Sequence, residues 1–405
     1  MCPPILKTER NKSNMRQSSD YTLVDTQEAL KIFYDDNYAV EWLAVDTEFI
    51  GEKRFEVLLC LIQVASSKGF YLIDPLAVTD LSLLLQLIED ERILKITHAG
   101  ENDYRLLNNL FGTIPKNIFD TQLAGGFIGH GYPASYGKLV EKELNILLDK
   151  GYAATDWEAR PLKRKQLEYA LSDVLHLHTL YQKMQDKLLV NNRLSWLFSE
   201  SKRWETPQYY DRDPHREALM NTMMQSLRLP KQVFLLRLYE WRRQEAQRLN
   251  HSKDMVLQSK FISPIIRSVD SGKQALMDSR IIPDRLVAQH WDTFQKLYQT
   301  QPTDEELAIL KRLPPLSKED PKKEVSMDLL HGLVKYKCME SGVAPSLVLN
   351  KSDLTYAKAG EDIFSSDGND WRREFMGEAM LRWLNERREL EVVMRDNEVV
   401  LRMKE

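Results

Sequence analysis

Two carboxylates stand two residues apart in the segment VDTEF, at Asp46 and Glu48. If this segment is a strand, residues i and i+2 project from the same face, so the two carboxylates meet at one edge of a sheet. Their neighbours are apolar, and burying two negative charges costs free energy unless a cation or a hydrogen-bond donor compensates. Taken alone, the motif fits a strand end with two solvated acids equally well.

Three further side chains could join this pair. Asp103 comes just past a strand-like run at residues 93–97 and begins a helical pattern. Functional groups gather at such strand ends in α/β proteins, although an acid there more often stabilises a helix N-terminus. Tyr169 and Asp173 are four residues apart in another helical pattern, so both project from one face of that helix.

Together these segments supply four carboxylates and one phenol. Hard oxygen ligands of this kind suit Mg²⁺ or Mn²⁺ rather than zinc. Four acids in one cluster would repel one another without metal. Two divalent ions about 4 Å apart would neutralise them, activate a water and stabilise the leaving oxygen of a phosphodiester. The pattern therefore predicts a two-metal centre for phosphodiester chemistry.

The elements that must position these residues follow from hydrophobic periodicity. Four runs predict strands, at residues 42–49, 57–65, 70–74 and 93–97, and residues 80–89 predict a helix. The first three strands are closely spaced, which predicts an antiparallel meander leading into α/β units, and hence a mixed sheet covered by helices. The amphipathic pattern at 162–187 predicts one long helix.

Length and composition limit the class of protein. The chain has 405 residues, 43% of them hydrophobic, and three cysteines far apart in sequence. These values exclude collagen-like and wholly disordered chains and allow about two to four domains. No apolar run approaches the ~18 residues of a membrane span, and the charged amino terminus does not fit a signal peptide. The cysteine pattern fits a reducing compartment, so we expect a cytoplasmic protein without a membrane partner.

The amino-acid composition changes along the chain, and these changes predict a tail, an α/β domain, two linkers and two helical blocks. Residues 1–20 are polar and predict a mobile tail before an α/β domain at 21–200. Segments 205–215 and 313–324 predict linkers and leave two all-helical blocks at 216–310 and 325–400. The net charge is -4, yet residues 201–300 hold 17 Lys+Arg against 11 Asp+Glu, or +6, and the remainder -10. That division fits a basic nucleic-acid surface and an ordinary helical surface alike.

The motifs and their order resemble the ribonuclease D family, within the DEDD superfamily of 3′–5′ exonucleases. The matching stretches are DTE at 46–48, HAGENDYRLL at 98–107, TDWEARPL at 155–162, YALSD at 169–173, LIQVA at 61–65, LIDPL at 72–76 and FDTQLA at 119–124. The Tyr-x-x-x-Asp form of YALSD marks the tyrosine subclass. The resemblance covers about residues 21–200 and implies a ribonuclease H-like α/β fold, a mixed sheet flanked by helices.

The resemblance also implies a role for each acid. Asp46 would bridge the two metal ions, while Glu48 and Asp173 would hold the ion that binds the attacking water. Asp103 would hold the ion at the 3′ leaving oxygen. Tyr169 would orient the water, because a phenol with its usual pKa of about 10 is a poor base at pH 7. The expected product is a nucleoside 5′-monophosphate.

Neighbouring residues are candidates for substrate contact. Phe49 could stack on a terminal base, and is equally consistent with a core position. His98 fits a hydrogen-bonded structural residue better than a metal ligand. Asp120 is expected to cap the helix that follows it, and the less favoured alternative is that it orients a neighbouring ligand. A basic run could guide backbone phosphates or form a solvated helix face, and it consists of Lys163, Arg164 and Lys165.

The two helical blocks resemble HRDC domains, which follow the nuclease in ribonuclease D. The second block matches at 329–354, and the first matches mainly in helix pattern. The resemblance implies auxiliary RNA binding by a monomer that trims the 3′ ends of structured RNA, tRNA precursors above all, without an obligate protein partner. Two alternatives are a 3′–5′ DNA exonuclease, which shares the catalytic motifs, and a non-catalytic RNA-binding scaffold, which usually lacks one of the acids retained here.

Overall fold

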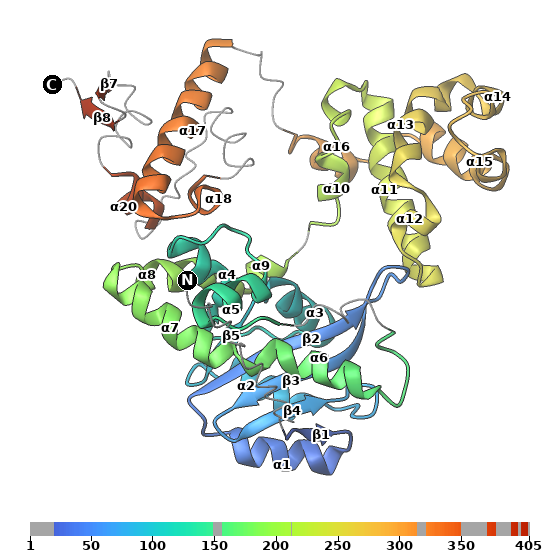
Figure 1. Ribbon diagram of the computed structural model, residues 1–405. Helices are drawn as coiled ribbons and strands as arrows, with labels where there is room; N and C mark the ends of the chain where they lie inside the picture. The colour runs from blue at the N-terminus through green and yellow to red at the C-terminus, as the bar shows by residue number, and fades with distance from the viewer. Residues whose placement is uncertain are drawn as a thin grey trace, which may run out of the picture.

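The computed structural model describes most of the chain (Figure 1). The described residues are 20–148, 156–211, 213–313, 321–349, 371–377, 390–395 and 398–403. The predicted tail at 1–20 lies outside them except for Asp20. No helix among the described residues is long and apolar enough to cross a membrane.

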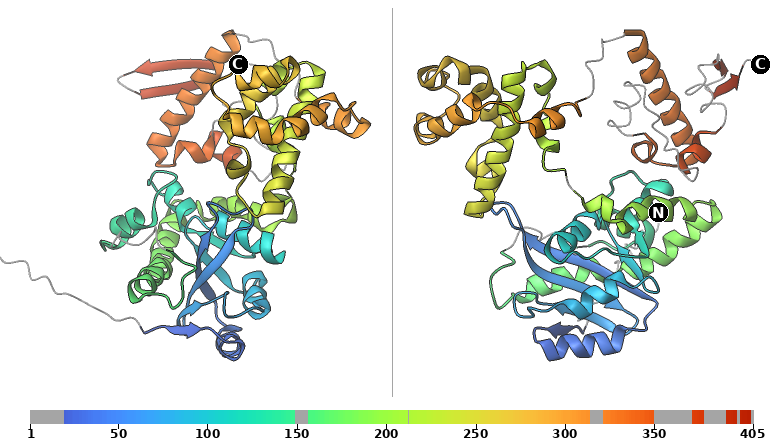
Figure 2. Two further views of the ribbon diagram at one scale, coloured as in Figure 1. Left: turned by 90° about the vertical axis from the view of Figure 1, so that its right-hand side faces the viewer. Right: turned by 180° about the vertical axis from the view of Figure 1, so that it is seen from behind.

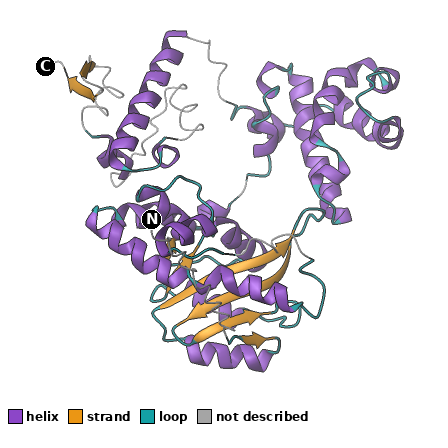
Figure 3. Cartoon of the chain, viewed as in Figure 1, coloured by secondary structure: helices purple, strands orange, loops and turns teal. Residues whose placement is uncertain are grey.

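A six-stranded mixed sheet forms the centre of the amino-terminal part, with strand order β1-β4-β3-β2-β5-β6 (Figure 3). Its strands are β1 (Thr22–Val24), β2 (Trp42–Ile50), β3 (Leu58–Ser66), β4 (Gly69–Ile73), β5 (Leu94–Thr97) and β6 (Ile118–Asp120). β2, β3 and β4 pair antiparallel, and the remaining pairs are parallel. The predicted meander and mixed sheet are therefore confirmed.

Helices cover both faces of this sheet (Figure 1). One face packs against α1 (Gln27–Asn37), α2 (Ser82–Glu89) and α3 (Glu101–Phe111) in a single apolar core. The other face packs against α6 (Arg164–Leu175) and α7 (Leu177–Val190). Three more helices pack around α7 and β6, namely α4 (Thr121–Phe127), α5 (Tyr136–Leu144) and α8 (Leu194–Ser201).

The helix predicted as continuous over 162–187 is two helices, which is a correction to the sequence interpretation. The two helices are separated at His176, a turn residue with φ -108° and ψ 0°. The break lets α6 lie across β2, β3 and β4, while α7 turns to contact β5, α4 and α5. Apolar spacing resumes with the buried Leu177 immediately after the break, so periodicity alone does not reveal it.

The predicted linker at 205–215 is wrong in its first half. A 3₁₀ turn (Lys202–Glu205) and the short helix α9 (Pro207–Tyr210) fold back on the α/β part. The Glu205 carboxylate accepts the backbone N–H of Asn117 at 3.1 Å. The guanidinium of Arg105 lies 4.2 Å from the ring centroid of Tyr209. These contacts order the segment despite its Pro and charge content.

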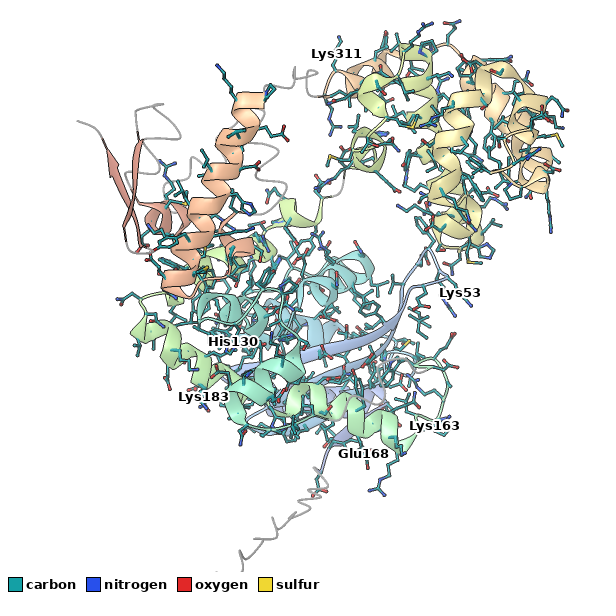
Figure 4. All side chains as sticks on the ribbon, turned by 45° about the horizontal axis from the view of Figure 1, so that its top comes forward. Lys53, His130, Lys163, Glu168, Lys183 and Lys311 are labelled. Carbon is teal, nitrogen blue, oxygen red and sulfur yellow. The ribbon has the colours of Figure 1, made fainter. Side chains whose placement is uncertain are left out.

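The first helical block has a core of its own, which includes the buried Phe234 and Phe294. Its helices are α10 (Arg216–Leu219), α11 (Leu229–Leu249), α12 (Lys253–Val256), α13 (Ser259–Ser268), α14 (Lys273–Met277), α15 (Asp284–Gln299) and α16 (Asp304–Leu310). The turn after α11 touches the β2–β3 loop near Lys53 (Figure 4). There Ser252 N donates to Lys53 O at 3.1 Å, and Glu56 N donates to the Asn250 side chain at 3.0 Å.

The second block packs directly on the α/β part. Its helices are α17 (Pro321–Ser341), α18 (Pro345–Val348) and α20 (Trp371–Met376). Trp371 stacks on Trp196 of α8 with ring centroids 5.4 Å apart, and Ala344 N donates to Gly126 O at 2.7 Å. The block was predicted as all-helical, but the antiparallel hairpin β7 (Leu390–Arg395) and β8 (Glu398–Met403) beside α17 corrects that expectation (Figure 2).

We expect Glu200→Ala to loosen this docking. Glu200 is buried and accepts hydrogen bonds from Trp371 Nε1 at 3.1 Å and from Arg372 at 2.8 Å. Removing the carboxylate takes away the acceptor that these two donors share, at a cost of about 2 kcal/mol. Limited proteolysis should then cleave the second block faster than in wild type, while the exposed-pair control Glu168→Ala cleaves normally. Equal cleavage of all three proteins would contradict this docking.

Candidate active site

Strand β2 presents its two acids on one face. Asp46 pairs with Gln63 and Glu48 pairs with Leu61 on β3, so both carboxylates project toward α6. The register then shifts between Glu48 and Phe49, which faces Leu59. Such a bulge adds local twist and re-aims side chains beside it. It lies at the end of the two-acid segment.

Helix α6 brings the third acid to the same place. Tyr169 and Asp173 are one helical turn apart, on the part of α6 that packs on β2, β3 and β4. One oxygen each from Asp46, Glu48 and Asp173 lies within 4.8 Å of the others. Residues 125 positions apart in sequence, from 48 to 173, thus form one oxygen cluster on the sheet.

Asp103 approaches from the other side of β2. β5 pairs only with residues 42–44 of β2, so the edge of β2 beyond Ala44 is open to the first turn of α3. There Thr47 Oγ1 donates a hydrogen bond to Asp103 Oδ1. Asp103 stands outside the three-acid group, yet its charge is close enough to raise the pKa of Asp46.

Asp120 holds the turn that leads into α3. One carboxylate oxygen caps α4 by accepting Gln122 N at 2.8 Å, as predicted, and the other accepts Gly100 N at 2.8 Å. A side chain at Gly100 would place its Cβ 2.6 Å from Thr97 Oγ1, so only glycine fits this turn. The result is a fixed start for α3 and therefore a fixed position for Asp103.

Arg160 anchors the segment that leads into α6. Its guanidinium makes a two-point contact with Asp74, at 2.6 and 2.8 Å, and donates to Cys60 O and Trp157 O at 2.7 Å each. Planar two-point contacts of this kind fix orientation as well as charge. They hold residues 157–160 against β3 and the end of β4, which places α6, and with it Tyr169, over the sheet.

The electrostatics of the cluster follow from burial and mutual repulsion. Burial raises the pKa of Asp46 well above its usual range, and the charges of Asp103, Asp173 and Glu48 raise it further. Burial, followed by the charges of Asp173 and Asp103, raises the pKa of Glu48 to about 8. Burial also raises the pKa of Asp103 and of Asp173 to about 7. Divalent cations of the Mg²⁺ or Mn²⁺ type would relieve this repulsion and take the carboxylate oxygens as ligands.

Tyr169 remains a neutral phenol in this setting. Burial raises its pKa above the ordinary value, and the charges of Asp173, Glu48 and Asp46 add to the shift. Its ring lies against Trp157, with centroids 6.2 Å apart. A neutral phenol can orient a water by hydrogen bonding, but it has no basic form available near pH 7.

The other sequence candidates have different surroundings. His98 Nδ1 lies 3.0 Å from Thr121 Oγ1, and that hydroxyl donates to Thr97 O, so His98 donates to the threonine as a structural residue. Phe49 alternates to the strand face away from Asp46 and is 39% exposed, which gives no support for a role at the cluster. The basic run is exposed at the start of α6, where Lys163 is labelled in Figure 4, and it comprises Lys163, Arg164 and Lys165.

Sequence reasoning assigned no role to two residues that support the site, although Thr47 lies inside the DTE motif and Arg160 inside TDWEARPL. For Asp120 it ranked the orientation of a ligand below helix capping, and the contact with Gly100 was not predicted. The contacts of Asp120 with Gly100, of Thr47 with Asp103 and of Arg160 with Asp74 span 20, 56 and 86 residues of sequence.

The fold and the cluster together define a 3′–5′ exonuclease, and comparison with known proteins agrees. The profile of the family described as 3′-5′ exonuclease matches residues 21–189. Ribonuclease D of Bartonella henselae is 32% identical over 348 residues, covering 84% of each chain. Ribonuclease D of Zymomonas mobilis is 34% identical, covering 83% of this chain and 87% of its own.

The whole architecture, including the helical blocks, also has a solved counterpart. The crystal structure of Escherichia coli RNase D, described as an exoribonuclease involved in structured RNA processing, superposes with a TM-score of 0.79 at 25% identity. The match covers 91% of this chain and 99% of that one. The chain belongs to the ribonuclease D family of 3′–5′ exoribonucleases, which confirms the resemblance drawn from the motifs.

We expect Arg160→Lys to loosen α6. Lysine keeps the charge but cannot make the two-point contact with Asp74 or reach Cys60 O and Trp157 O together. The free energy of unfolding should fall by about 1–3 kcal/mol, and turnover should fall with it. Urea denaturation and activity assays measure both. Arg92→Lys, on a two-point pair with Asp90 in which the arginine is exposed, is the matched control and should change neither by much. Wild-type behaviour of Arg160→Lys would contradict the anchoring role.

A second expectation concerns the metal-free protein. Because the pKa of Glu48 is raised to about 8, this carboxyl binds more protons in the folded state than in the unfolded chain between about pH 4 and pH 8. This carboxyl therefore removes stability progressively as the pH rises toward 8. Glu48→Gln should be more stable than wild type in EDTA, with an advantage of about 2–4 kcal/mol at pH 8 that shrinks toward pH 5. Chemical denaturation at both pH values checks this. An advantage that is equal or larger at pH 5 would contradict it.

Proposed function

We propose that this chain removes nucleotides one at a time from the 3′ ends of structured RNA, tRNA precursors above all. The single observation that carries the proposal is the oxygen cluster of Asp46, Glu48 and Asp173, with Asp103 beside it, in a chain of the ribonuclease D family. The expected products are nucleoside 5′-monophosphates. The description of E. coli RNase D as a structured-RNA enzyme supports the substrate class.

The four acids are proposed to hold two divalent cations, Mg²⁺ or Mn²⁺. When bound, these ions would lower the pKa of a water and offset the negative charge that develops on the leaving oxygen. The charges of the other three acids all raise the pKa of Asp46, so this carboxylate lies close to each of them. Asp46 would therefore be shared between the two cation positions. Glu48 and Asp173, whose oxygens lie within 4.8 Å of one another and of Asp46, would complete the first cation position. Asp103 would complete the second.

The remaining groups act by orientation. Tyr169 stands one turn from Asp173 and, as a neutral phenol, would hold the attacking water by a hydrogen bond. Thr47 fixes the Asp103 carboxylate by donating to it. The neutral phenol and the hydroxyl add no positive charge to the cluster, so they leave the acids available for cations.

The helical blocks are proposed as RNA-binding modules of the HRDC type. The excess of basic residues at 201–300 supports a contact with backbone phosphates. Attachment of both blocks to the nuclease part would raise the local concentration of RNA at the site. The exposed basic run at the start of α6 could extend this surface. We propose that the protein acts as a monomer in the cytoplasm, where the buried free thiols of Cys60 and Cys338 would stay reduced.

Two other functions have less support. A 3′–5′ DNA exonuclease would use the same acids, but the relatives that match over most of their length are ribonucleases. A non-catalytic RNA-binding scaffold would not need these partly buried acids, whose mutual repulsion destabilises the fold without metal. Both alternatives are separated from the main proposal by the experiment below.

We expect Asp46→Asn to lose at least about 10³-fold in turnover on a 3′-extended tRNA, because it removes the shared ligand. Gel sizing of the shortened RNA and chromatography of the released nucleotides measure the loss, with and without Mn²⁺. Asp36→Asn, an exposed acid on α1, is the matched control and should keep wild-type activity. A matched 3′-tailed DNA should be a poorer substrate. Substantial turnover by Asp46→Asn, or faster degradation of the DNA, would contradict the proposal.

A further inference from the structure

A buried amide without a hydrogen-bond partner lies beside the acid cluster. Gln63, at the centre of β3, has no exposed surface. Neither Nε2 nor Oε1 of its side chain has a hydrogen-bond partner among the described residues. Burying an amide in this way costs about 1–3 kcal/mol by mutational measures. An apolar side chain of the same size at this position would make the folded protein more stable. The amide therefore calls for a functional explanation.

The position of Gln63 in the sheet limits what that reason can be. It is the direct partner of Asp46 across the β2–β3 ladder, so the two side chains share a face and start about 5 Å apart. Its other ladder partner, on β4, is Leu72. Along its own strand the flanking residues on this face are Leu61 and Ala65, both buried. Among these neighbours in the sheet, only Asp46 carries a polar side chain.

A second buried amide shows how this fold treats amides that serve structure. Asn37, on α1 at the opposite face of the sheet, is also fully buried. Its Nδ2 donates to Phe33 O at 2.8 Å, and its Oδ1 accepts from Ser66 Oγ at 2.5 Å. Both ends of that side chain are satisfied within the protein. Of these two fully buried amides, the one that lies beside Asp46 is the one without partners.

We propose that Gln63 is a positioning residue that donates its Nε2–H to the Asp46 carboxylate when Asp46 is in its metal-holding orientation. The inference rests on the proposed function, in which Asp46 must direct its two oxygens to two cations. A donor on the neighbouring strand would fix the carboxylate plane. An amide is suited to this task because it is neutral, whereas Lys or Arg would itself neutralise the acid and compete with the cation.

The test uses the full-length protein and Gln63→Met, which keeps length and volume but removes the amide. Manganese binding is measured by calorimetry without RNA, and thermal stability is measured in EDTA. We expect the dissociation constant for Mn²⁺ to rise about 10–100-fold, as for other groups that support metal ligands. The metal-free melting temperature should stay equal or increase, because an unsatisfied amide is gone. At saturating Mn²⁺, the KM for RNA should be unchanged.

Two controls separate the possible failures. Asn37→Leu removes the satisfied amide, so it should lower the melting temperature and leave Mn²⁺ binding unchanged. Asp46→Asn should abolish the high-affinity Mn²⁺ binding, and if it does not, the proposed metal site itself is wrong. If Asp46→Asn behaves as expected but Gln63→Met binds Mn²⁺ like wild type, the role of Gln63 is overturned. That role is equally overturned if Gln63→Met only loses stability, as Asn37→Leu does.

A measurement on the wild-type protein covers the case in which Gln63→Met does not fold. The side-chain amide resonance of Gln63 can be followed by NMR during titration with diamagnetic Mg²⁺. Formation of the bond to Asp46 should shift this resonance and slow its hydrogen exchange. The Asn37 amide, already bonded on the far face, should not change. A Gln63 resonance that is unaffected by saturating Mg²⁺ would overturn the inference.

Discussion

Mutual repulsion among partly buried carboxylates is the constraint on which the rest of this structure depends. Asp46, Glu48 and Asp173 present oxygens within 4.8 Å of one another, and Asp103 adds a fourth charge from the opposite side of β2. Left to themselves, these groups would separate or take up protons, because neither burial nor proximity favours their charged forms. The sheet and two helices hold them together against that tendency. In the proposed metal site, the free energy of this repulsion would be released when divalent cations bind.

The surrounding architecture can be understood as the means of holding the acids in place. Arg160 ties the entry of α6 to the end of the meander, and Asp120 ties the entry of α3 to α4. Both contacts act at the start of a helix, where a small displacement would move the acid it carries. Beyond the sheet, the second helical block shares a core with α4 and α8, whereas the first block touches the β2–β3 loop through the turn after α11. The nuclease part thus has one extensively packed neighbour and one that contacts it at a loop.

The sequence predicted what depends on local order and missed what depends on distant partners. Short β-rich runs predicted β2, β3 and β4, and the spacing of DTE and YALSD predicted which acids share a face. The break at His176 was missed because the apolar pattern continues through it. The order of residues 205–210 was missed because it arises from contacts with Asn117 and with Arg105 of α3. Gln63 stood inside a matching motif, but its lack of a partner is a property of the folded core alone.

The most direct measurement of the central claim is anomalous diffraction from crystals of the full-length protein soaked in Mn²⁺. We expect one strong anomalous peak bounded by Asp46, Glu48 and Asp173, and a second between Asp46 and Asp103. Crystals of Asp46→Asn should lose at least one of the two. Manganese peaks that lie elsewhere on the chain, with none at the cluster, would show that the clustered acids are not a cation site and would contradict the proposed mechanism.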